Sequence, residues 1–187
     1  DHLVVVVGHG REQVEAHLAE VAPQVSVAVQ ANPLGTGDAV RSGLSVLSGL
    51  TGEVVVTSGD VPLLTGETLA DLVLAHREQR NDITVLTAVV PDPTGYGRIV
   101  RDGDVVARIV EQKDASEYEA AIGEINAGIY VFDAALLTEG ISRLEAGNAQ
   151  GELYLTDVIG HATGAGRRVG ARLLADHLQT EGVNDRL

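Results

Sequence analysis

Asp60 is a carboxylate at a position where it could bind a metal ion or a ligand. It follows a largely apolar run, Glu-Val-Val-Val-Thr-Ser at residues 53–58, and opens the segment Asp-Val-Pro-Leu-Leu. Ligands of open α/β sheets bind at the carboxyl ends of the strands, and a carboxylate held there can bind Mg²⁺ together with nucleotide phosphates. Asp is also common before Pro and in turns, so the alternative is that Asp60 only caps the next turn or helix.

A second candidate is the loop Pro-Leu-Gly-Thr-Gly-Asp-Ala at residues 33–39, between an expected strand and an expected helix. Its two glycines allow the backbone to pass close to a flat or phosphorylated ligand. Gln30, just upstream, offers an amide with both a donor and an acceptor, which suits the edge of a nucleobase. The alternative is an ordinary loop in which Thr36 caps the helix.

Polar residues also occur at the ends and inside of apolar runs in the second half of the chain. Glu111 ends one run, and Asn126 interrupts another, although Asn disfavours strands and a buried amide must be hydrogen-bonded. A carboxylate and an amide at neighbouring strand ends are suitable partners for sugar hydroxyls. The segment at residues 93–99, Pro-Thr-Gly-Tyr-Gly-Arg-Ile, reads by itself as a tight turn.

Other catalytic classes lose support. The chain has no Cys, no serine in a nucleophile elbow and no Walker sequence, and its six histidines show no metal-ligand spacing. We therefore expect the histidines to be structural or solvated. Gly8 and Gly10 resemble a dinucleotide fingerprint, but Gln13 replaces the third glycine. The prediction of a nicotinamide-dependent dehydrogenase would rest on these two glycines alone.

Alternating apolar runs and helical patterns must position these residues. Strands of the first half are expected at residues 3–7, 25–29, 54–57 and 83–90. Helical spacing between them predicts a mostly parallel α/β sheet covered on both faces, since continuous apolar strands need burial on both sides.

The pattern changes in the second half. Runs at residues 96–100 and 105–110 flank an Asp-Gly turn, which predicts a β-hairpin inserted as a lobe over the strand ends. We expect further strands at residues 125–132 and 169–174 and helices near residues 134–144 and 153–162. No linker or repeat divides the chain.

The composition fits one globular domain. The chain has 187 residues, of which 44% are hydrophobic, and a net charge of −14 from 27 acidic and 13 basic residues. This charge repels nucleic acid and anionic membranes, so we expect neither as a partner. An anionic substrate would need a metal or a few basic groups, and Lys113 is the only Lys. The lack of Cys favours the cytoplasm, and no apolar stretch approaches the length of a membrane span.

Several segments, taken in order, resemble the uridyltransferase half of the bacterial bifunctional N-acetylglucosamine-1-phosphate uridyltransferase and glucosamine-1-phosphate acetyltransferase. These segments are PLGTGDA, GDVPLL, PTGYGRIV, VEQKDA, EINAGIYVFD, GELYLTDVI and EGVNDR. The resemblance implies a Rossmann-like nucleotidyltransferase domain. The implied reaction joins UTP and N-acetylglucosamine 1-phosphate into UDP-N-acetylglucosamine, a peptidoglycan precursor, and pyrophosphate.

The resemblance also implies roles for individual residues. The residues expected to contact uracil, called the uracil set, are Gln30, Gly35 and Thr36, and together with residues 58–60 they form the nucleotide set. Ser58 and Gly59 line the nucleotide beside Asp60, and the Mg²⁺ ligands, which are the catalytic pair, are Asp60 and Asn184. The residues expected to contact the N-acetylglucosamine part, called the sugar set, are Gly97, Glu111, Asn126, Tyr154 and Thr156. A sugar phosphate is already an anionic nucleophile, so this reaction needs positioning and charge relief rather than a general base.

Some features depart from the family pattern. The family begins with a strand, a glycine-rich loop and a phosphate-contacting lysine, and none of these precedes Asp1. We therefore expect residues 1–187 to be a partial domain, truncated at its N-terminus, that alone binds UTP poorly and turns over negligibly. The acetyltransferase half, a β-helix through which the parent protein is expected to form a homotrimer, is also absent. Asp38 replaces a usual His, and Asp185 a usual second Asn.

Two rival functions remain open from the sequence. One is another sugar-1-phosphate nucleotidyltransferase that uses a different base or sugar. The other is a non-catalytic domain that binds sugar nucleotides. Gln30 and the EINAGI segment argue against the first, and the presence of Asp60 and Asn184 argues against the second.

Overall fold

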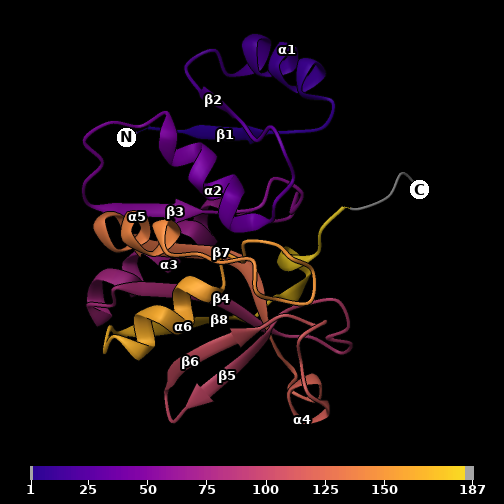
Figure 1. The fold of residues 1–187 in the computed structure, drawn as a ribbon, viewed down its shortest axis with the longest axis vertical. Coiled ribbons are helices and arrows are strands. Elements are labelled where there is room, and N and C mark those ends of the chain that lie inside the picture. Colours follow the sequence, from indigo (N-terminus) through magenta and orange to yellow (C-terminus); the bar gives the residue numbers. More distant parts are fainter. Residues whose placement is uncertain (1, 184–187) are drawn as a thin grey trace.

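The computed structural model describes residues 2–183 as an α/β protein with two sheets (Figure 1). The strands are β1 (Val4–Val7), β2 (Ser26–Val29), β3 (Glu53–Val56), β4 (Ile83–Val89), β5 (Arg98–Asp102), β6 (Val105–Val110), β7 (Glu124–Asp133) and β8 (Val169–Leu174). The α-helices are α1 (Arg11–Val21), α2 (Thr36–Ser45), α3 (Gly66–Gln79), α4 (Glu117–Ala120), α5 (Ala134–Ser142) and α6 (Asp157–Gly164). A short 3-10 helix, η1, covers His177–Thr180.

β7 is the central strand of the larger, six-stranded sheet. It pairs antiparallel with β4 along one side. On its other side, residues 130–133 pair antiparallel with β3, and Ile125 pairs with β5. β6 continues the sheet beyond β5, while β8 lies parallel to β4 at the opposite edge. Residues 127–129 of β7 therefore lie in a gap between β3 and β5.

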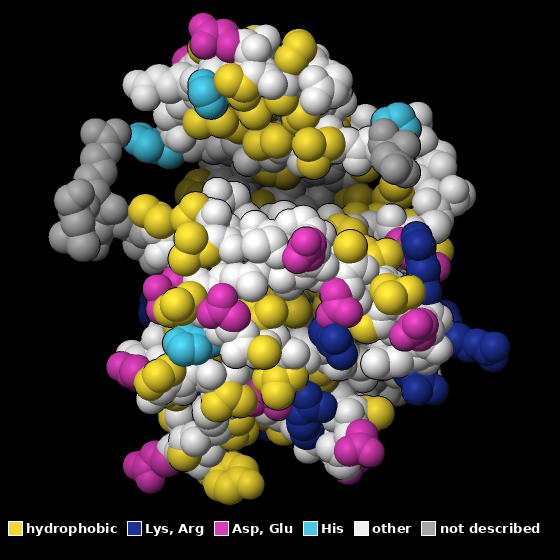
Figure 2. All heavy atoms as spheres, turned by 180° about the vertical axis from the view of Figure 1, so that it is seen from behind, with side chains coloured by type: hydrophobic (Ala, Val, Ile, Leu, Met, Phe, Trp, Pro, Cys, Tyr) yellow, Lys and Arg dark blue, Asp and Glu magenta, His cyan; other side chains and the backbone are white. Residues whose placement is uncertain are grey.

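β1 and β2 form a separate two-stranded parallel sheet. Helix α2 contacts both of these strands and also α5, so it links the N-terminal layer to the rest of the molecule. Within residues 2–183, no strand pairing joins the two sheets. Seen from behind, the surface is hollowed between the N-terminal layer and the larger sheet, and hydrophobic side chains gather on that layer (Figure 2).

Helices cover both faces of the larger sheet. α5 and α6 pack on one face, in a core that includes Phe132, Leu137 and Ile159. α3 covers the opposite face, where Leu72 packs with Ile129. Burial on both faces explains why the sequences of β4 and β7 are nearly continuous apolar runs.

Local sequence signals set the ends of several elements. Thr65 caps α3 by accepting a hydrogen bond from the Thr68 N–H, and Asp133 caps α5 by accepting one from the Leu136 N–H. Between β5 and β6, Gly103 has a φ of +59°, a conformation that favours Gly. The predicted Asp-Gly hairpin is therefore present.

The α/β class, the hairpin and every predicted strand are present, and two expectations need correction. The larger sheet is mixed, because β7 runs antiparallel to its three partners, where mostly parallel pairing was predicted. The helix expected at residues 153–162 begins only at Asp157, because the backbone of Leu153 is hydrogen-bonded to another loop. Every helix in the described part of the chain is too short or too polar to cross a membrane.

Candidate functional site

The gap along β7 is the centre of the candidate site. After β3, the chain passes through Ser58, whose Oγ would lie 3.5 Å from a Cβ added to Gly128. Before β5, the Gly97 carbonyl accepts a hydrogen bond of 2.9 Å from the Asn126 N–H. The chain leaving β3 and the chain entering β5 thus meet the same stretch of β7. This brings Ser58, of the predicted nucleotide set, close to two residues of the predicted sugar set.

Two side-chain hydrogen bonds hold Asn126 at the edge of this gap. Its Nδ2 donates to the Tyr130 Oη at 2.7 Å, and its Oδ1 accepts from the Gly128 N–H at 3.0 Å. Burial raises the pKa of the Tyr130 hydroxyl, so the hydroxyl stays neutral at physiological pH. Sequence reasoning missed Tyr130 and Gly128. An Asn-Ala-Gly triplet inside an apolar run was the available signal.

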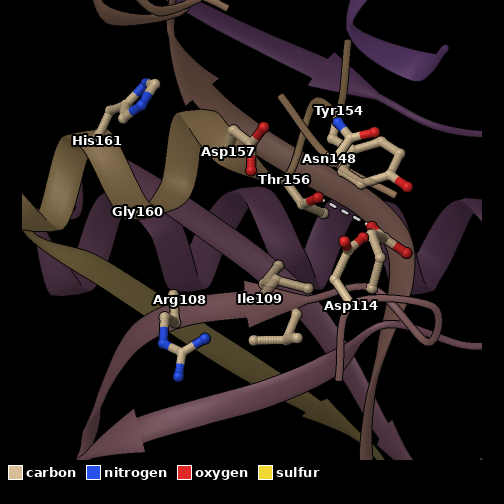
Figure 3. Close-up of a pocket in the computed structure, with 11 residues that line it drawn as sticks. Arg108, Ile109, Asp114, Asn148, Tyr154, Thr156, Asp157, Gly160 and His161 are labelled. Atoms are coloured by element: carbon tan, nitrogen blue, oxygen red, sulfur yellow. Dashed lines mark hydrogen bonds between the residues drawn. The ribbon is translucent and has the colours of Figure 1, made fainter. Parts of the chain in front are cut away.

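A cavity of about 290 Å³ lies between β6 and α6 (Figure 3). Glu111, Tyr154 and Thr156, three residues of the predicted sugar set, line it. The Thr156 Oγ1 donates a hydrogen bond of 2.9 Å to the Glu111 Oε1. Gly97 lies beside the same carboxylate, since a Cβ there would be 3.4 Å from the Glu111 Oε2. The predicted sugar residues therefore form one connected group.

Several carboxylates surround this cavity. Burial is the main cause of the raised pKa of Glu111; the Thr156 hydrogen bond opposes it, and the charges of Asp157 and Asp114 add to it. Burial also raises the pKa of Asp157, against the effect of His161. Acceptor groups of this kind suit the hydroxyl and amide donors of a sugar and repel a phosphate.

Tyr154 is oriented by a chain of polar side chains. Its Oη accepts a hydrogen bond of 2.8 Å from the Gln150 Nε2. The Gln150 Oε1 in turn accepts from the Lys113 Nζ at 2.5 Å. The single Lys of the chain therefore lies beside Tyr154, a residue of the predicted sugar set.

The loop at residues 34–37 is hydrogen-bonded to the segment at residues 153–155. The Leu153 N–H donates to the Leu34 carbonyl at 2.7 Å, and the Gly37 N–H donates to the Leu153 carbonyl at 2.8 Å. The Thr36 Oγ1 accepts from the Leu155 N–H at 3.1 Å. Thr36 thus joins two segments through its hydroxyl and does not act as the cap of α2, where Gly35 is the N-cap residue.

Gln30 lies beside this loop and its amide nitrogen has two acceptors. The Nε2 donates to the Gly35 carbonyl at 3.1 Å and to the Asp38 Oδ2 at 2.9 Å. Asp38 is buried, and its other oxygen accepts from the Arg41 Nη2. Its part in the site was not anticipated from the sequence, where only the departure from the family pattern marked it.

Asp60 follows β3 and is exposed, as are Ser58 and Gly59. Its carbonyl accepts a hydrogen bond of 2.8 Å from the Val183 N–H, so the end of the described chain returns to this position. Asn184, the second predicted Mg²⁺ ligand, lies outside the described residues, as does Asp185. Among residues 2–183, no cluster of three or more His, Cys, Asp or Glu residues is arranged to hold a metal ion.

The predicted nucleotide set is therefore divided between two places. Gln30, Gly35 and Thr36 lie at the start of α2, whereas residues 58–60 lie at the end of β3. The sugar set adjoins both places. Leu153 and Leu155, which flank Tyr154, are hydrogen-bonded to the first, and Gly128, in the β7 gap, lies against Ser58.

Comparison with known proteins decides the family. Residues 1–177 match the model of the nucleotidyl transferase family, which covers most of the chain. The chain belongs to the nucleotidyl transferase family. A nucleoside-diphosphate-sugar pyrophosphorylase from Vibrio cholerae has a similar fold, with a TM-score of 0.70 and 16% identity over 95% of this chain and 74% of that chain. The predicted nucleotidyltransferase fold is thereby confirmed.

Curated relatives of this nucleotidyl transferase are named bifunctional protein GlmU. The protein of Cutibacterium acnes is 63% identical and that of Streptomyces avermitilis 56% identical, each over the whole of this chain. That of Thermobifida fusca is 53% identical over 98% of this chain. The chain spans between 39% and 46% of the length of these relatives.

Proposed function

We propose that this nucleotidyl transferase domain transfers a uridylyl group from UTP to N-acetylglucosamine 1-phosphate, giving UDP-N-acetylglucosamine and pyrophosphate. One observation carries the proposal: Ser58 of the nucleotide set and Gly97 of the sugar set both meet β7 at residues 126–128, Ser58 beside Gly128 and the Gly97 carbonyl on the N–H of Asn126, which also belongs to the sugar set. The similarity to bifunctional GlmU proteins over the whole chain supports the same reaction.

The contact between Gln30 and Gly35 supports uracil as the base. The Gln30 Nε2 donates a hydrogen bond to the Gly35 carbonyl at 3.1 Å. This donor and this acceptor stand side by side, as do the O4 acceptor and the N3–H donor of uracil. Exchange of the one contact for two hydrogen bonds to the base leaves no polar group unpaired.

The carboxylates of the cavity orient the sugar phosphate. Glu111, Asp114 and Asp157 accept hydrogen bonds from hydroxyl groups and repel the phosphate. The phosphate end is therefore directed away from the cavity. Asn126 adds an amide whose orientation is fixed by the Gly128 N–H at its oxygen and by the Tyr130 hydroxyl at its nitrogen, which lowers the entropy lost on binding.

Asp60 has the chemistry expected of a Mg²⁺ ligand. Its carboxylate is a hard oxygen donor, and it is exposed at the end of β3. Mg²⁺ usually keeps several waters and takes one or two carboxylates plus substrate phosphates, so a single Asp fits a nucleotide-bound Mg²⁺. We infer that Asp60 holds this ion together with Asn184.

The transfer itself needs little acid–base chemistry. A phosphate oxygen of the sugar phosphate forms a bond to the α-phosphorus of UTP, and the bond from that phosphorus to pyrophosphate breaks. Because the nucleophile is already anionic, the protein has to align the two substrates and relieve their repulsion. Bound Mg²⁺ supplies the charge neutralisation. The residues of the uracil and sugar sets supply the alignment.

The test is the release of pyrophosphate from UTP and N-acetylglucosamine 1-phosphate. It should be run on this chain and on a version extended at its N-terminus by the expected glycine-rich loop and lysine, with other nucleoside triphosphates and glucose 1-phosphate as alternatives. We expect Mg²⁺-dependent release with UTP and the N-acetylated sugar in the extended version. Asp60→Asn should abolish it, while Asp102→Asn at the hairpin tip should not.

Two results would overturn the proposal. One is a clear preference of the extended version for another base or sugar. The other is binding of UDP-N-acetylglucosamine that does not depend on Mg²⁺, without any pyrophosphate release, which would indicate a binding domain.

A further inference from the structure

Asp38 contacts the side chain that is proposed to read the base. Its Oδ2 accepts a hydrogen bond of 2.9 Å from the Gln30 Nε2. We propose that Asp38 is a positioning residue that makes the site select uracil over cytosine, because it fixes which end of the Gln30 amide faces the base. This inference rests on the proposed function, in which Gln30 contacts the base.

The chemistry of the two groups permits one orientation of the amide. An ionised carboxylate is an acceptor only, so it can face the amide nitrogen and not the amide oxygen. Nε2 has two hydrogens, and in this structure one is directed to Asp38 and the other to the Gly35 carbonyl. A flipped Gln30 would place its Oε1 against the Asp38 carboxylate and lose both hydrogen bonds.

Several features keep Asp38 ionised and in place. Its exposed fraction is 8%, and burial alone would raise its pKa, but hydrogen bonds from Gln30 and Arg41 hold that pKa below its ordinary value. Arg41 donates to the Oδ1, which leaves Oδ2 for Gln30. The backbone of Asp38 also lies in the first turn of α2, where a negative charge is favourable. The carboxylate is therefore a fixed acceptor rather than a mobile side chain.

The fixed amide distinguishes the two pyrimidines. Uracil presents the O4 acceptor and the N3–H donor, which complement the Gln30 N–H and the Gly35 carbonyl. Cytosine presents an N4 amino donor and an N3 acceptor on the same edge, so a donor would face a donor and an acceptor would face an acceptor. A flipped Gln30 could accept a hydrogen bond from the cytosine amino group. Preventing that flip is the contribution of Asp38.

Asp38→Asn tests the inference, because an Asn side chain can pair with the Gln30 amide in either orientation. In the N-terminally extended version, the kcat/KM and the Kd should be measured for UTP and for CTP. We expect the UTP-to-CTP ratio to fall about tenfold, the size expected when one bond of a two-point base contact is lost. Asp71→Asn is the matched control, because Asp71 is also a helical aspartate paired with an arginine, Arg172, away from the site.

A double-mutant cycle shows whether Asp38 acts through Gln30. If it does, Asp38→Asn changes the ratio in the parent and has no further effect on it in the Gln30→Ala background. A purely structural role would lower the kcat/KM for both nucleotides equally and leave the ratio unchanged, which would overturn the inference. If Gln30→Ala itself leaves the ratio unchanged, the assignment of Gln30 to the base fails, and that outcome is separate from a failure of Asp38 alone.

Discussion

Gly35→Ala should separate the loop at residues 34–37 from the segment at residues 153–155. Gly35 has a φ of +104° and a ψ of 177°, a region that only Gly occupies readily. An added Cβ would lie 2.7 Å from the Leu153 carbonyl oxygen and 3.0 Å from the Leu153 nitrogen. Both are backbone atoms, so no side-chain rotation can relieve the clash.

The cost can be estimated from these contacts. The unusual backbone conformation costs about 1–3 kcal/mol for a residue other than Gly. Moving the loop away also breaks the hydrogen bonds between Leu153 and Leu34, between Gly37 and Leu153, and between Leu155 and Thr36. Each is worth about 1 kcal/mol, so we expect a total loss of about 4–6 kcal/mol in the free energy of unfolding.

Gly52→Ala is the matched control for this substitution. Gly52 also has a positive φ, +81°, but an added Cβ there meets no atom within 4 Å. It should cost about 1–2 kcal/mol from backbone strain alone. Urea denaturation measures both losses, and amide hydrogen exchange of Leu155 reports whether the loop has detached. Equal losses for the two variants, or an unchanged Leu155 exchange rate in Gly35→Ala, would refute this reasoning.

Three further substitutions test other contacts. Tyr130→Phe removes the hydroxyl that accepts a hydrogen bond from the Asn126 amide, so the free energy of unfolding should fall by about 1–2 kcal/mol. The KM for the sugar phosphate should rise without a change in kcat. An unchanged KM in steady-state kinetics would contradict this. The raised pKa of Glu111 means that folding disfavours its charged form, so stability falls as pH rises from the ordinary pKa to above the raised one. Glu111→Gln should therefore stabilise the protein at pH 7 but not near pH 4, as judged by urea denaturation at both values, and an equal effect at both would argue against it. Arg98→Lys cannot reproduce the hydrogen bonds from the buried guanidinium to the Tyr96 carbonyl and the Gln112 side chain. We therefore expect the free energy of unfolding, measured by thermal or urea denaturation, to fall by about 2–4 kcal/mol. A loss below about 1 kcal/mol would show that these two hydrogen bonds contribute little to stability.

Features with local causes were predictable from the sequence. The run at residues 169–174 has the same bounds as β8, and the Asp-Gly turn produces the β5–β6 hairpin around Gly103. Apolar runs and turn residues determine such features within a few positions of themselves. The α/β class follows from the same signals.

Strand direction was not predictable in the same way. The apolar run of β7 indicates a buried strand but carries no information on its partners, which lie as far away in sequence as β3. Likewise, the apolar residues Leu155, Val158, Ile159 and Ala162 recur at helical spacing, which predicted a helix that includes Leu153. The distant loop at residues 34–37 instead hydrogen-bonds the backbone of Leu153 and Leu155, so residues 151–154 have no regular secondary structure and residues 155 and 156 form a turn.

For the candidate site, the sequence indicated residues at strand ends but not the side chains that hold them. Glu111 was identifiable because it ends an apolar run, and Asn126 because it interrupts one. Tyr130 and Asp38 were not, because a Tyr in a strand and an Asp in a first helical turn are ordinary there. Their contacts with Asn126 and Gln30 arise only from the tertiary arrangement.

A crystal structure of the N-terminally extended version with UDP-N-acetylglucosamine and Mg²⁺ tests the central claim most directly. We predict the uracil at Gln30 and Gly35, the sugar in contact with Glu111 and Asn126, and the metal ion on Asp60. A uracil bound away from Gln30 and Gly35, a sugar away from Glu111 and Asn126, or a metal ion away from Asp60 would contradict the account.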